Sequence, residues 1–552
     1  MLGRLQELGP LLLGRGVHLG ALSALLADRY GQRTAVEDDA ATPGLHDGGA
    51  RSYDEVEHAV ARLAAAHRAA GVQRGDVVLV LVANRIDVVL HALALTRLGA
   101  VPAPVNPRLK PGEVAAVAAS TTARAVVADD ELALSLRPQG ELGDLRWLRT
   151  GDTGDEGASG DSIAAWLGGH EDQVPPPDHL DPGATALMLT TSGTTGVPKA
   201  AVLTSRGLLS GIGRLVLAPV GVQAGPRGGR DLVMAALPLP HVMGFSVVLS
   251  TLCAGVPLLH RGRFDADEVL DLIERRRPNV FVGVPTMYAD LEQAGAAQRD
   301  LSSVQLFVSA ADAMPTHRAR RFQEHGAAMR VRDKPRGTAV FVDIYGMVEL
   351  SGAAALRVFP PSPLRGVRVP SVSLMLPGMQ VRAVDEAGEP VAYGKVGELQ
   401  FRGAGVLERY EGRDDAGPDA EGWFGTGDFG RIWPGGLFAF AGRTRDRLKV
   451  GGFSVFPAEV EEELREHPDV ADVAVVGVAD ERLGERPVAM IVASGDVDVD
   501  VDGLLAWCQD HVAGYRRPTE VLVVADLPRG ANGKLDRRTA TDQAEQLMAE
   551  AR

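Results

Sequence analysis

The alternation of strand-like and helix-like apolar patterns constrains the fold of this chain more than any other feature of its sequence. Residues 55–70 and 87–98 carry apolar side chains at helical spacing, whereas residues 76–82 and 101–105 form the short apolar runs that are typical of buried strands. Parallel strands need a crossover connection, and a helix usually supplies it. The alternation therefore predicts an α/β fold with mainly parallel sheets.

The same alternation returns in the middle of the chain. Strands are predicted at 232–237, 280–283 and 304–308, and helices at 266–276 and 286–293. After residue 442 the pattern changes to that of a smaller unit. There we predict a helix at 457–466 and strands at 470–478 and 487–492.

The length and this change of pattern predict two domains. A chain of 552 residues exceeds what one hydrophobic core usually supports. A boundary near Arg443 divides it into a large domain, residues 1–442, and a small one, residues 443–552. Segments 151–182 and 409–422 are polar and contain several glycines, so we expect a linker and an exposed loop there.

Charge and cysteine content exclude several classes of function. The formal net charge of −15 argues against a nucleic acid or an anionic membrane as a general partner. Cys253 and Cys508 have no paired spacing, so neither a disulfide framework nor a zinc site is predicted, and a cytoplasmic location is expected. No segment reaches the roughly 18 uninterrupted apolar residues of a membrane span. Residues 1–26 are predicted to form an amphipathic helix rather than a signal peptide.

Residues 190–199, TTSGTTGVPK, carry the strongest indication of chemistry. They follow an apolar run at residues 186–189 and combine hydroxyls, glycines and one lysine. Glycines let backbone N–H groups converge on an anion, hydroxyls add donors and Lys199 adds charge, so the segment can wrap a polyphosphate. The G-x-x-x-x-G-K-[ST] spacing of the common ATPase loop does not fit, which indicates a different way of using ATP. The alternative, a solvated Gly/Thr turn, does not require the lysine.

Four further clusters combine residue types that suit a nucleotide. They lie at residues 341–349, 422–428, 442–452 and 528–535. Tyr345 can stack on a base and Glu349 can hold Mg²⁺. Asp428, on a tight Gly turn, suits a ribose diol, and Lys534 is presented on a Gly-containing loop. Each residue alone is also explained as a core aromatic, a turn former or a surface charge, so the order and spacing of all the clusters carry the argument.

In this order, the clusters resemble those of the adenylate-forming superfamily, which comprises acyl- and aryl-CoA ligases, peptide-synthetase adenylation domains and firefly luciferase. The resemblance extends over about residues 20 to 540. It implies a large N-terminal domain of β-sheets flanked by helices, which binds ATP and the acid, and a small mobile α+β C-terminal domain, which carries the catalytic lysine. It also implies that a carboxylate attacks the α-phosphate of MgATP, leaving an acyl adenylate and pyrophosphate, and that a thiol such as CoA then takes the acyl group.

The resemblance implies a role for each matching residue. The catalytic residues would be Lys534 at the carboxylate and α-phosphate, Glu349 at Mg²⁺, and Lys199 at the β- and γ-phosphates. The other nucleotide-binding residues would be Thr191, Ser192, Gly193, Thr194, Thr195 and Gly196 around the phosphates, Ser309, Ala310, Ala311, Asp343, Tyr345 and Gly346 on the adenine side, and Asp428 and Arg443 at the ribose. The acyl pocket and the route of the thiol would be lined by His241, Gly244, Lys449, Gly451 and Gly452, with Arg445 as the hinge. A structural role for His241 is an equally good explanation.

Three positions depart from the family pattern. Val348 replaces the usual threonine, and a lost hydrogen bond to a charged phosphate costs about 1.5–3 kcal/mol, or about ten- to a hundredfold in rate. Ser351 is a candidate replacement donor. Ala200 and Ser205 replace the usual Gly and His after the phosphate segment. Activity is nevertheless expected.

The sequence favours a free-standing ATP-dependent acid–CoA ligase. Because the chain ends soon after Lys534, we expect no appended carrier domain, and the apolar segment 242–252 favours a hydrophobic acid, fatty or aryl. One alternative is an adenylating enzyme that passes the acyl group to a carrier protein or another nucleophile. Another is a nucleotide-binding homologue without catalysis, which Val348 motivates. The oligomeric state stays open, with a homodimer as one alternative.

Overall fold

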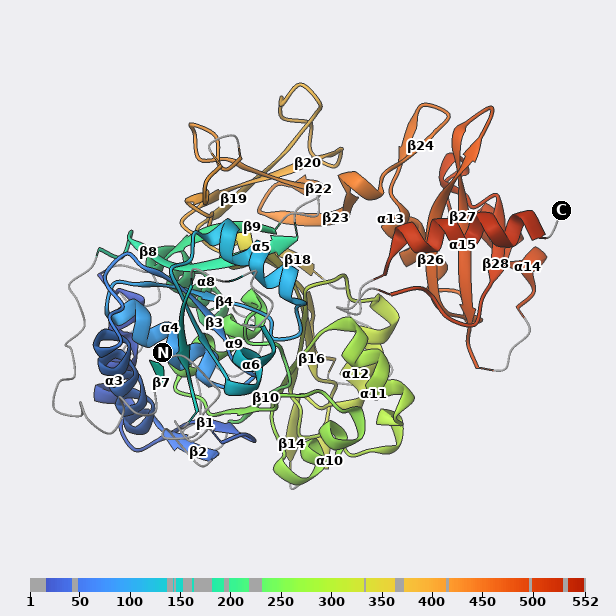
Figure 1. Ribbon diagram of the computed structural model, residues 1–552. Coiled ribbons are helices and arrows are strands. Elements are labelled where there is room, and N and C mark those ends of the chain that lie inside the picture. The colour runs from blue at the N-terminus through green and yellow to red at the C-terminus, as the bar shows by residue number, and fades with distance from the viewer. Residues whose placement is uncertain are drawn as a thin grey trace. The chain divides into compact units, whose positions relative to one another are not determined.

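The computed structural model divides the chain into two compact units (Figure 1). It describes residues 16–41, 48–136, 142, 145–151, 161–162, 181–192, 198–217, 231–331, 334–362, 372–413, 416–495, 499–529 and 535–550. Unit 1 contains Met1–Ala311, Phe322–Met379 and Arg402–Phe424, and unit 2 contains Asp312–Arg321, Gln380–Phe401 and Gly425–Arg552. The domain boundary near Arg443 stays a prediction.

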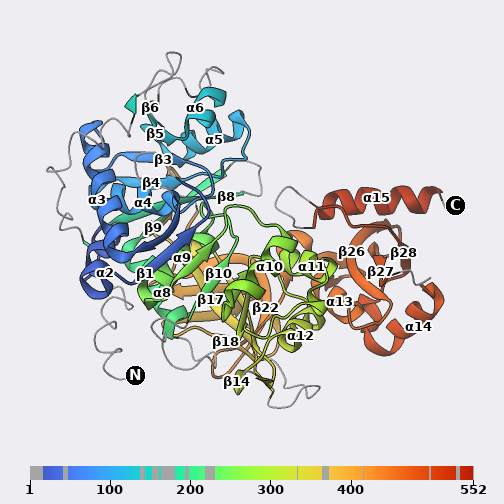
Figure 2. The ribbon, with the colours of Figure 1, turned by 90° about the horizontal axis from the view of Figure 1, so that it is seen from below.

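A five-stranded parallel sheet forms the N-terminal part of unit 1. Its strand order is β4 (Val101–Pro104), β3 (Val77–Leu81), β5 (Ala125–Ala128), β6 (Arg146–Arg149) and β7 (Asp161–Ser162). All of β3 is buried, as expected of a central strand in a parallel sheet. Helix α4 (Asp87–Arg97) connects β3 to β4, and α5 (Pro111–Thr121) connects β4 to β5 (Figure 2). These are the crossovers that the apolar alternation predicts.

A second sheet of unit 1 is built from the middle of the chain and the first two strands. Its order is β18 (Val372–Met375), β17 (Gly352–Phe359), β16 (Val340–Met347), β13 (Leu306–Ala310), β12 (Val280–Gly283), β10 (Val233–Ala235), β11 (Leu258–His260), β1 (Thr34–Asp38) and β2 (Gly49–Ser52). The strands from β16 to β1 pair in parallel, whereas β17, β18 and β2 pair antiparallel with their neighbours. The carboxyl ends of β13 and β16 therefore lie side by side, which is where open α/β sheets bind ligands.

The third sheet of unit 1 carries the predicted phosphate segment. Strands β8 (Thr185–Ser192) and β9 (Pro198–Thr204) form an antiparallel hairpin, and β21 (Arg409–Tyr410) pairs with the other edge of β9. The prediction of an exposed loop at 409–422 is therefore wrong for its first two residues, because they form a strand and Tyr410 is buried. A strand of this length has no apolar period that a sequence pattern can reveal.

The helices of unit 1 begin at recognisable signals. The backbone N–H of Glu55 donates to Ser52, and the Glu55 side chain accepts from the backbone N–H of Ser52, so a capping box starts α3 (Tyr53–Ala69). Asp265 caps α10 (Ala266–Arg276) with its side chain. The described residues of unit 1 also form α2 (Leu22–Tyr30), α6 (Asp130–Leu136), α8 (Ser205–Leu217), α9 (Val242–Ala254) and α11 (Pro285–Gln293). Helix α12 (Thr316–His325) contains the point, residue 322, at which the chain returns from unit 2 to unit 1.

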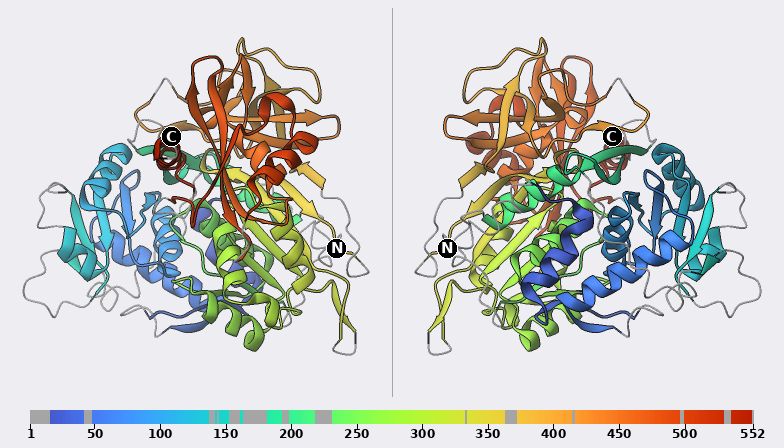
Figure 3. Two further views of the ribbon diagram at one scale, coloured as in Figure 1. Left: turned by 90° about the vertical axis from the view of Figure 1, so that its right-hand side faces the viewer. Right: turned by 90° about the vertical axis from the view of Figure 1, so that its left-hand side faces the viewer.

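The described strands of unit 2 form two groups of neighbouring strands. The first has the order β19 (Met379–Val384), β20 (Val396–Gly403), β22 (Phe424–Trp433) and β23 (Leu437–Arg443). The second has the order β25 (Phe453–Val455), β24 (Leu448–Val450), β27 (Gly484–Ala493) and β26 (Val470–Asp480), with β28 (Glu520–Val523) parallel to β27. The long β26–β27 pair is orange to red in Figure 3.

The second sheet of unit 2 buries both of its faces. Val473 and Val475 of β26 pack with residues of α13 (Pro457–Leu464) and α14 (Val501–His511). Ala474 and Val476 pack with residues of α15 (Arg537–Glu550) instead. Successive side chains of a strand point to opposite faces, so one strand supplies two apolar cores.

The predicted elements agree with the structure at most positions. The predicted helix at 266–276 is α10, the predicted strand at 280–283 is β12, and the predicted helix at 457–466 is α13, which ends two residues earlier. Residues 1–15 of the predicted N-terminal helix and most of the predicted linker at 151–182 lie outside the described residues. Among the residues that the structure describes, no helix combines the length and apolar character needed to cross a membrane.

Candidate active site

The two ends of the predicted phosphate segment lie opposite each other. In the β8–β9 hairpin, Thr191 pairs with Lys199 and Ser192 pairs with Pro198. Residues 193–197, which include the predicted Gly193, Thr194, Thr195 and Gly196, lie outside the described residues. The predicted phosphate segment therefore begins on one strand of an antiparallel pair and ends on the other.

Glu349 and Lys199 meet on a tyrosine that sequence reasoning missed. Glu349 lies in a short 3-10 helix, Val348–Leu350, directly after β16. The Tyr410 hydroxyl donates a hydrogen bond of 2.7 Å to Oε1 of Glu349. The Lys199 ammonium lies 5.4 Å from the centroid of the Tyr410 ring, within the range of a cation–π contact. A predicted metal ligand and a predicted phosphate ligand therefore touch the two ends of one side chain.

The Tyr410 side chain is buried, with 6% of its surface exposed. Burial, and then the neighbouring Glu349 carboxylate, raises the pKa of Tyr410 above its usual range, because both disfavour a phenolate. The hydroxyl therefore stays protonated and acts as a donor to Glu349.

The adenine-side residues lie at the carboxyl ends of β13 and β16. Ser309 is opposite Asp343, and Ala310 is opposite Ile344, in the parallel register of these strands. The Ser309 side chain is completely buried. Ala311 has a φ of 76°, a left-handed conformation that costs a residue with a side chain about 1–2 kcal/mol. The structure thus brings Ser309, Ala310, Ala311 and Asp343 together at one edge of the sheet.

Tyr345 and Gly346 continue β16 beyond that edge. The register of β16 with β17 shifts between these two residues, which is an irregularity of the β-bulge type. A Cβ atom on Gly346 would lie 2.0 Å from the carbonyl oxygen of Gly352, so no other residue fits without backbone movement. Packing between strands therefore explains this glycine on its own.

The structure does not support Ser351 as a replacement for the hydroxyl that Val348 lacks. Ser351 is 3% exposed and its hydroxyl is a buried atom. A Cβ atom on Gly207 of α8 would lie only 3.0 Å from this hydroxyl. The Ser351 hydroxyl therefore faces the interior at α8.

The predicted ribose pair lies in one hairpin of unit 2. Asp428 on β22 pairs with Arg443 on β23, and Nε of Arg443 lies 3.4 Å from Oδ1 of Asp428. Asp428 is buried, with 4% of its surface exposed, whereas 38% of the Arg443 side chain is exposed. The oxygens of the Asp428 carboxylate can accept hydrogen bonds from a diol.

The predicted hinge and thiol-route residues follow this pair along unit 2. Arg445 is exposed in a short 3-10 helix, and its Nε lies 3.7 Å from Asp446. Lys449 is exposed on β24, and its backbone N–H donates to Glu485. Gly451 and Gly452 have φ values of 57° and 87°, which L residues with side chains rarely adopt. This turn therefore requires glycine for backbone reasons as well as for any passage of a thiol.

The predicted acyl-pocket residues begin helix α9. His241 is exposed at the N-cap position, and its carbonyl oxygen accepts a hydrogen bond from the backbone N–H of Phe245. A Cβ atom on Gly244 would lie 2.3 Å from the carbonyl oxygen of Pro238, so glycine is required for close packing. The predicted catalytic Lys534 lies outside the described residues.

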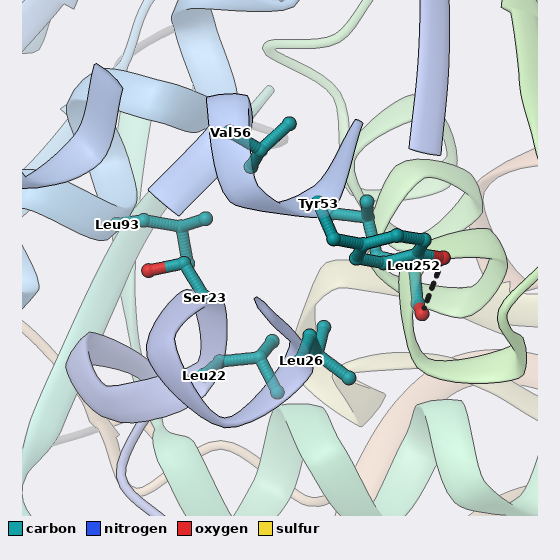
Figure 4. A pocket seen from close by; sticks show the side chains of 7 residues that line it. All are labelled: Leu22, Ser23, Leu26, Tyr53, Val56, Leu93 and Leu252. Atoms are coloured by element: carbon teal, nitrogen blue, oxygen red, sulfur yellow. Dashed lines mark hydrogen bonds between the residues drawn. The ribbon is translucent and has the colours of Figure 1, made fainter. Parts of the chain in front are cut away.

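A small apolar pocket in unit 1 is not part of this site. Figure 4 shows its lining, which consists of Leu22, Ser23, Leu26, Tyr53, Val56, Leu93 and Leu252. The Tyr53 hydroxyl donates a 3.0 Å hydrogen bond to the carbonyl oxygen of Leu252. The pocket has no room for a water molecule, and none of the predicted site residues lines it.

Comparisons with known proteins identify the family of this chain. The chain matches the AMP-binding enzyme family over residues 25–411 and the AMP-binding enzyme C-terminal domain over residues 459–534. A feruloyl-CoA synthase of Amycolatopsis sp is 33% identical over 505 residues, which cover 90% of this chain and 94% of that protein. A 4-coumarate–CoA ligase of Oryza sativa subsp. japonica is 30% identical over 534 residues, which cover 93% and 91%.

A solved structure has a similar fold. ATP-bound MatB from Rhodopseudomonas palustris is 26% identical and superposes with a TM-score of 0.77 over 96% of this chain and 100% of that chain. The predicted α/β fold and the prediction of an acid–thiol ligase that works through an acyl adenylate are confirmed. This chain therefore belongs to the AMP-binding enzyme family.

Proposed function

We propose that this enzyme uses MgATP to activate an aryl-substituted carboxylic acid, of the hydroxycinnamate class, and transfers the acyl group to CoA. The observation that carries the activation step is the meeting of Glu349 and Lys199 on Tyr410. These three residues come from different segments of unit 1, and together they offer a carboxylate for a cation and an ammonium for a phosphate. Such an arrangement suits the polyphosphate of ATP.

The proposed roles follow from the chemistry of each side chain. Lys199 and Thr191 bind the β- and γ-phosphates from the ends of the β8–β9 hairpin. Tyr345 lies against adenine, and Asp428 accepts hydrogen bonds from the ribose hydroxyls with Arg443 beside it. Lys534 stabilises the charge that develops on the carboxylate and the α-phosphate as pyrophosphate leaves.

Glu349 fits the proposed role as a ligand of Mg²⁺. An ionised carboxylate has about four acceptor sites, and the bond from Tyr410 occupies one of them. The side chain is half-buried, so it is open to a ligand on one side. When bound, Mg²⁺ would neutralise charge on the phosphate oxygens.

The class of acid rests on the relatives and on α9. Feruloyl-CoA synthase and 4-coumarate–CoA ligase are named for aromatic propenoic acids. In this chain, α9 is mainly apolar and carries no charged side chain. A neutral aromatic ring is compatible with such a helix, whereas a second carboxylate would be left without a charged partner there.

A panel of acids tests this proposal. Pyrophosphate release is measured with ferulate, 4-coumarate, benzoate, octanoate and malonate, each with and without CoA. We expect the two hydroxycinnamates to give the largest kcat/KM and CoA to accelerate turnover. A preference for octanoate or malonate would contradict the acid class, and ADP rather than AMP as the nucleotide product would contradict the reaction.

The same assay separates the alternatives. Replacing CoA by a phosphopantetheinylated carrier protein tests whether a carrier is the acceptor, and failure of acid-dependent ATP–pyrophosphate exchange with every acid would favour a non-catalytic homologue.

The formation of a homodimer is tested by light scattering. A cytoplasmic location is proposed because Cys253 and Cys508 are both free and buried.

A further inference from the structure

Tyr410 is the side chain that connects the two charged groups of the proposed phosphate site. We propose that it is a positioning residue, which orients the Glu349 carboxylate toward Mg²⁺ with its hydroxyl and holds the Lys199 ammonium toward the phosphates with its ring. This inference rests on the proposed roles of Glu349 and Lys199. It adds a residue that the resemblance to the family did not supply.

The backbone around Tyr410 is fastened to both partners. On one side, the backbone N–H of Leu407 donates to the carbonyl oxygen of Glu349 at 2.7 Å. On the other side, the backbone N–H of Glu411 donates to the carbonyl oxygen of Ala200 at 2.9 Å, and Tyr410 pairs with Ala201 in the β21–β9 register. Backbone hydrogen bonds alone therefore hold the segment 407–411 to the backbone of Glu349 and to strand β9.

The register explains why the Tyr410 ring reaches Lys199. Tyr410 is opposite Ala201, and Lys199 lies two residues away on the same face of β9. Diagonal neighbours in an antiparallel pair are about 7–8 Å apart at Cα, which an aromatic ring and a lysine can bridge. The ring fixes the ammonium by a cation–π contact without neutralising it, so the charge stays available to an anion.

The hydroxyl acts differently on Glu349. A hydrogen bond from a neutral donor to a carboxylate fixes the orientation of the carboxylate plane but leaves its negative charge in place. Partners of this kind orient metal ligands, and their loss typically costs about 10- to 100-fold in metal affinity or activity. Tyr410 therefore offers two separable contributions, one from the hydroxyl and one from the ring.

Two substitutions separate these contributions. Tyr410→Phe keeps the ring and removes the hydroxyl, whereas Tyr410→Leu removes both. Tyr393, which is 64% exposed, supplies the matched control Tyr393→Phe. Glu349→Gln supplies the reference for loss of the metal carboxylate itself.

The measurement is ATP binding by the full chain, by titration calorimetry without acid, as a function of Mg²⁺ concentration. We expect Tyr410→Phe to raise the Mg²⁺ concentration for half-maximal effect by about tenfold, while ATP affinity at saturating Mg²⁺ stays near that of the parent. Tyr410→Leu should show the same Mg²⁺ shift and in addition weaken ATP affinity at saturating Mg²⁺ by about two- to fivefold. Tyr393→Phe should match the parent in both quantities.

The outcomes distinguish the inference from the proposal beneath it. If Glu349→Gln leaves the Mg²⁺ dependence unchanged, the metal role of Glu349 is wrong. If Glu349→Gln shifts it and Tyr410→Phe does not, the positioning role of the hydroxyl is overturned. Equal ATP affinity of the Phe and Leu variants at saturating Mg²⁺ would overturn the role of the ring. Tyr410→Phe tests the inference even if Tyr410→Leu fails to fold.

Discussion

In the proposed phosphate region, Glu349 and Lys199 are far apart in the sequence and are linked through Tyr410, which comes from a third segment. In the proposed ribose region, Asp428 and Arg443 are cross-strand neighbours in a single β22–β23 hairpin. The first region therefore depends on tertiary packing, whereas the register of two consecutive strands is sufficient for the second. A substitution in the first should disturb several groups, and a substitution in the second should act locally.

The largest effect is expected at Lys534, which we assign to neither region. If the two regions only hold the nucleotide, the charge that develops during adenylation must be stabilised by another group. Lys534→Ala should lower the rate of pyrophosphate release by at least about a thousandfold and largely spare thioester formation from a supplied acyl adenylate. Single-turnover assays of the two steps check this, with the exposed Lys395→Ala as control. An equal loss in both steps would show that Lys534 supports the structure rather than the first reaction.

Glu349→Gln tests the phosphate region. The amide keeps the shape of the side chain but removes the charge that we assign to Mg²⁺, so kcat for adenylation should fall by about a hundredfold. The thermal unfolding temperature of the variant should stay close to that of the parent, because Glu349 is half-buried rather than part of the core. Glu131→Gln on α6 is an exposed control. A change confined to KM for the acid would contradict the assignment of Glu349 to Mg²⁺.

Asp428→Asn tests the ribose region. The amide NH₂ group cannot accept the hydrogen bonds of a diol, and the charge beside Arg443 is lost, so KM for ATP should rise by about tenfold while kcat changes little. Steady-state kinetics with varied ATP measure this, and Asp510→Asn on α14 is the exposed control. A fall in kcat as large as that of Glu349→Gln would remove the distinction between the two regions.

The smallest effect is expected from Arg443→Gln. Because 38% of the Arg443 side chain is exposed, solvent and salt screen its interaction with Asp428. KM for ATP should rise by only about two- to fivefold, and the difference from the parent should shrink as ionic strength increases. An effect that exceeds that of Asp428→Asn and does not respond to salt would mean that Arg443, and not Asp428, dominates the ribose contact.

The contrast between the regions also explains what the sequence could and could not predict. Asp428 stood out because it lies on a tight Gly turn, and Glu349 because it ends a distinctive cluster. Tyr410 gave no such signal. It lies in a strand of two residues inside a polar segment, and its importance comes from pairing with β9. Only tertiary structure reveals a contact of that kind.

The fold could be predicted from the sequence more completely than the site. Helix α10 and strand β12 have the predicted bounds, because amphipathic helices and buried parallel strands repeat their apolar pattern over several residues. Glycines were harder to interpret. Gly244 and Gly346 matched functional motifs, yet the structure shows that close backbone contacts alone would require them.

The left-handed residues indicate where this enzyme can be made more heat-resistant. Four non-glycine residues in the described part of the chain have a positive φ, namely Thr122, Arg277, Ala311 and Ser351. Thr122 is the C-cap of α5, a position at which glycine relaxes the backbone without touching any proposed ligand contact. Ala311 and Ser351 flank the proposed nucleotide site instead. An engineer who seeks a more durable enzyme should therefore prefer Thr122 to Ala311 and Ser351, because the same exchange at these two positions would alter the geometry of the proposed nucleotide site.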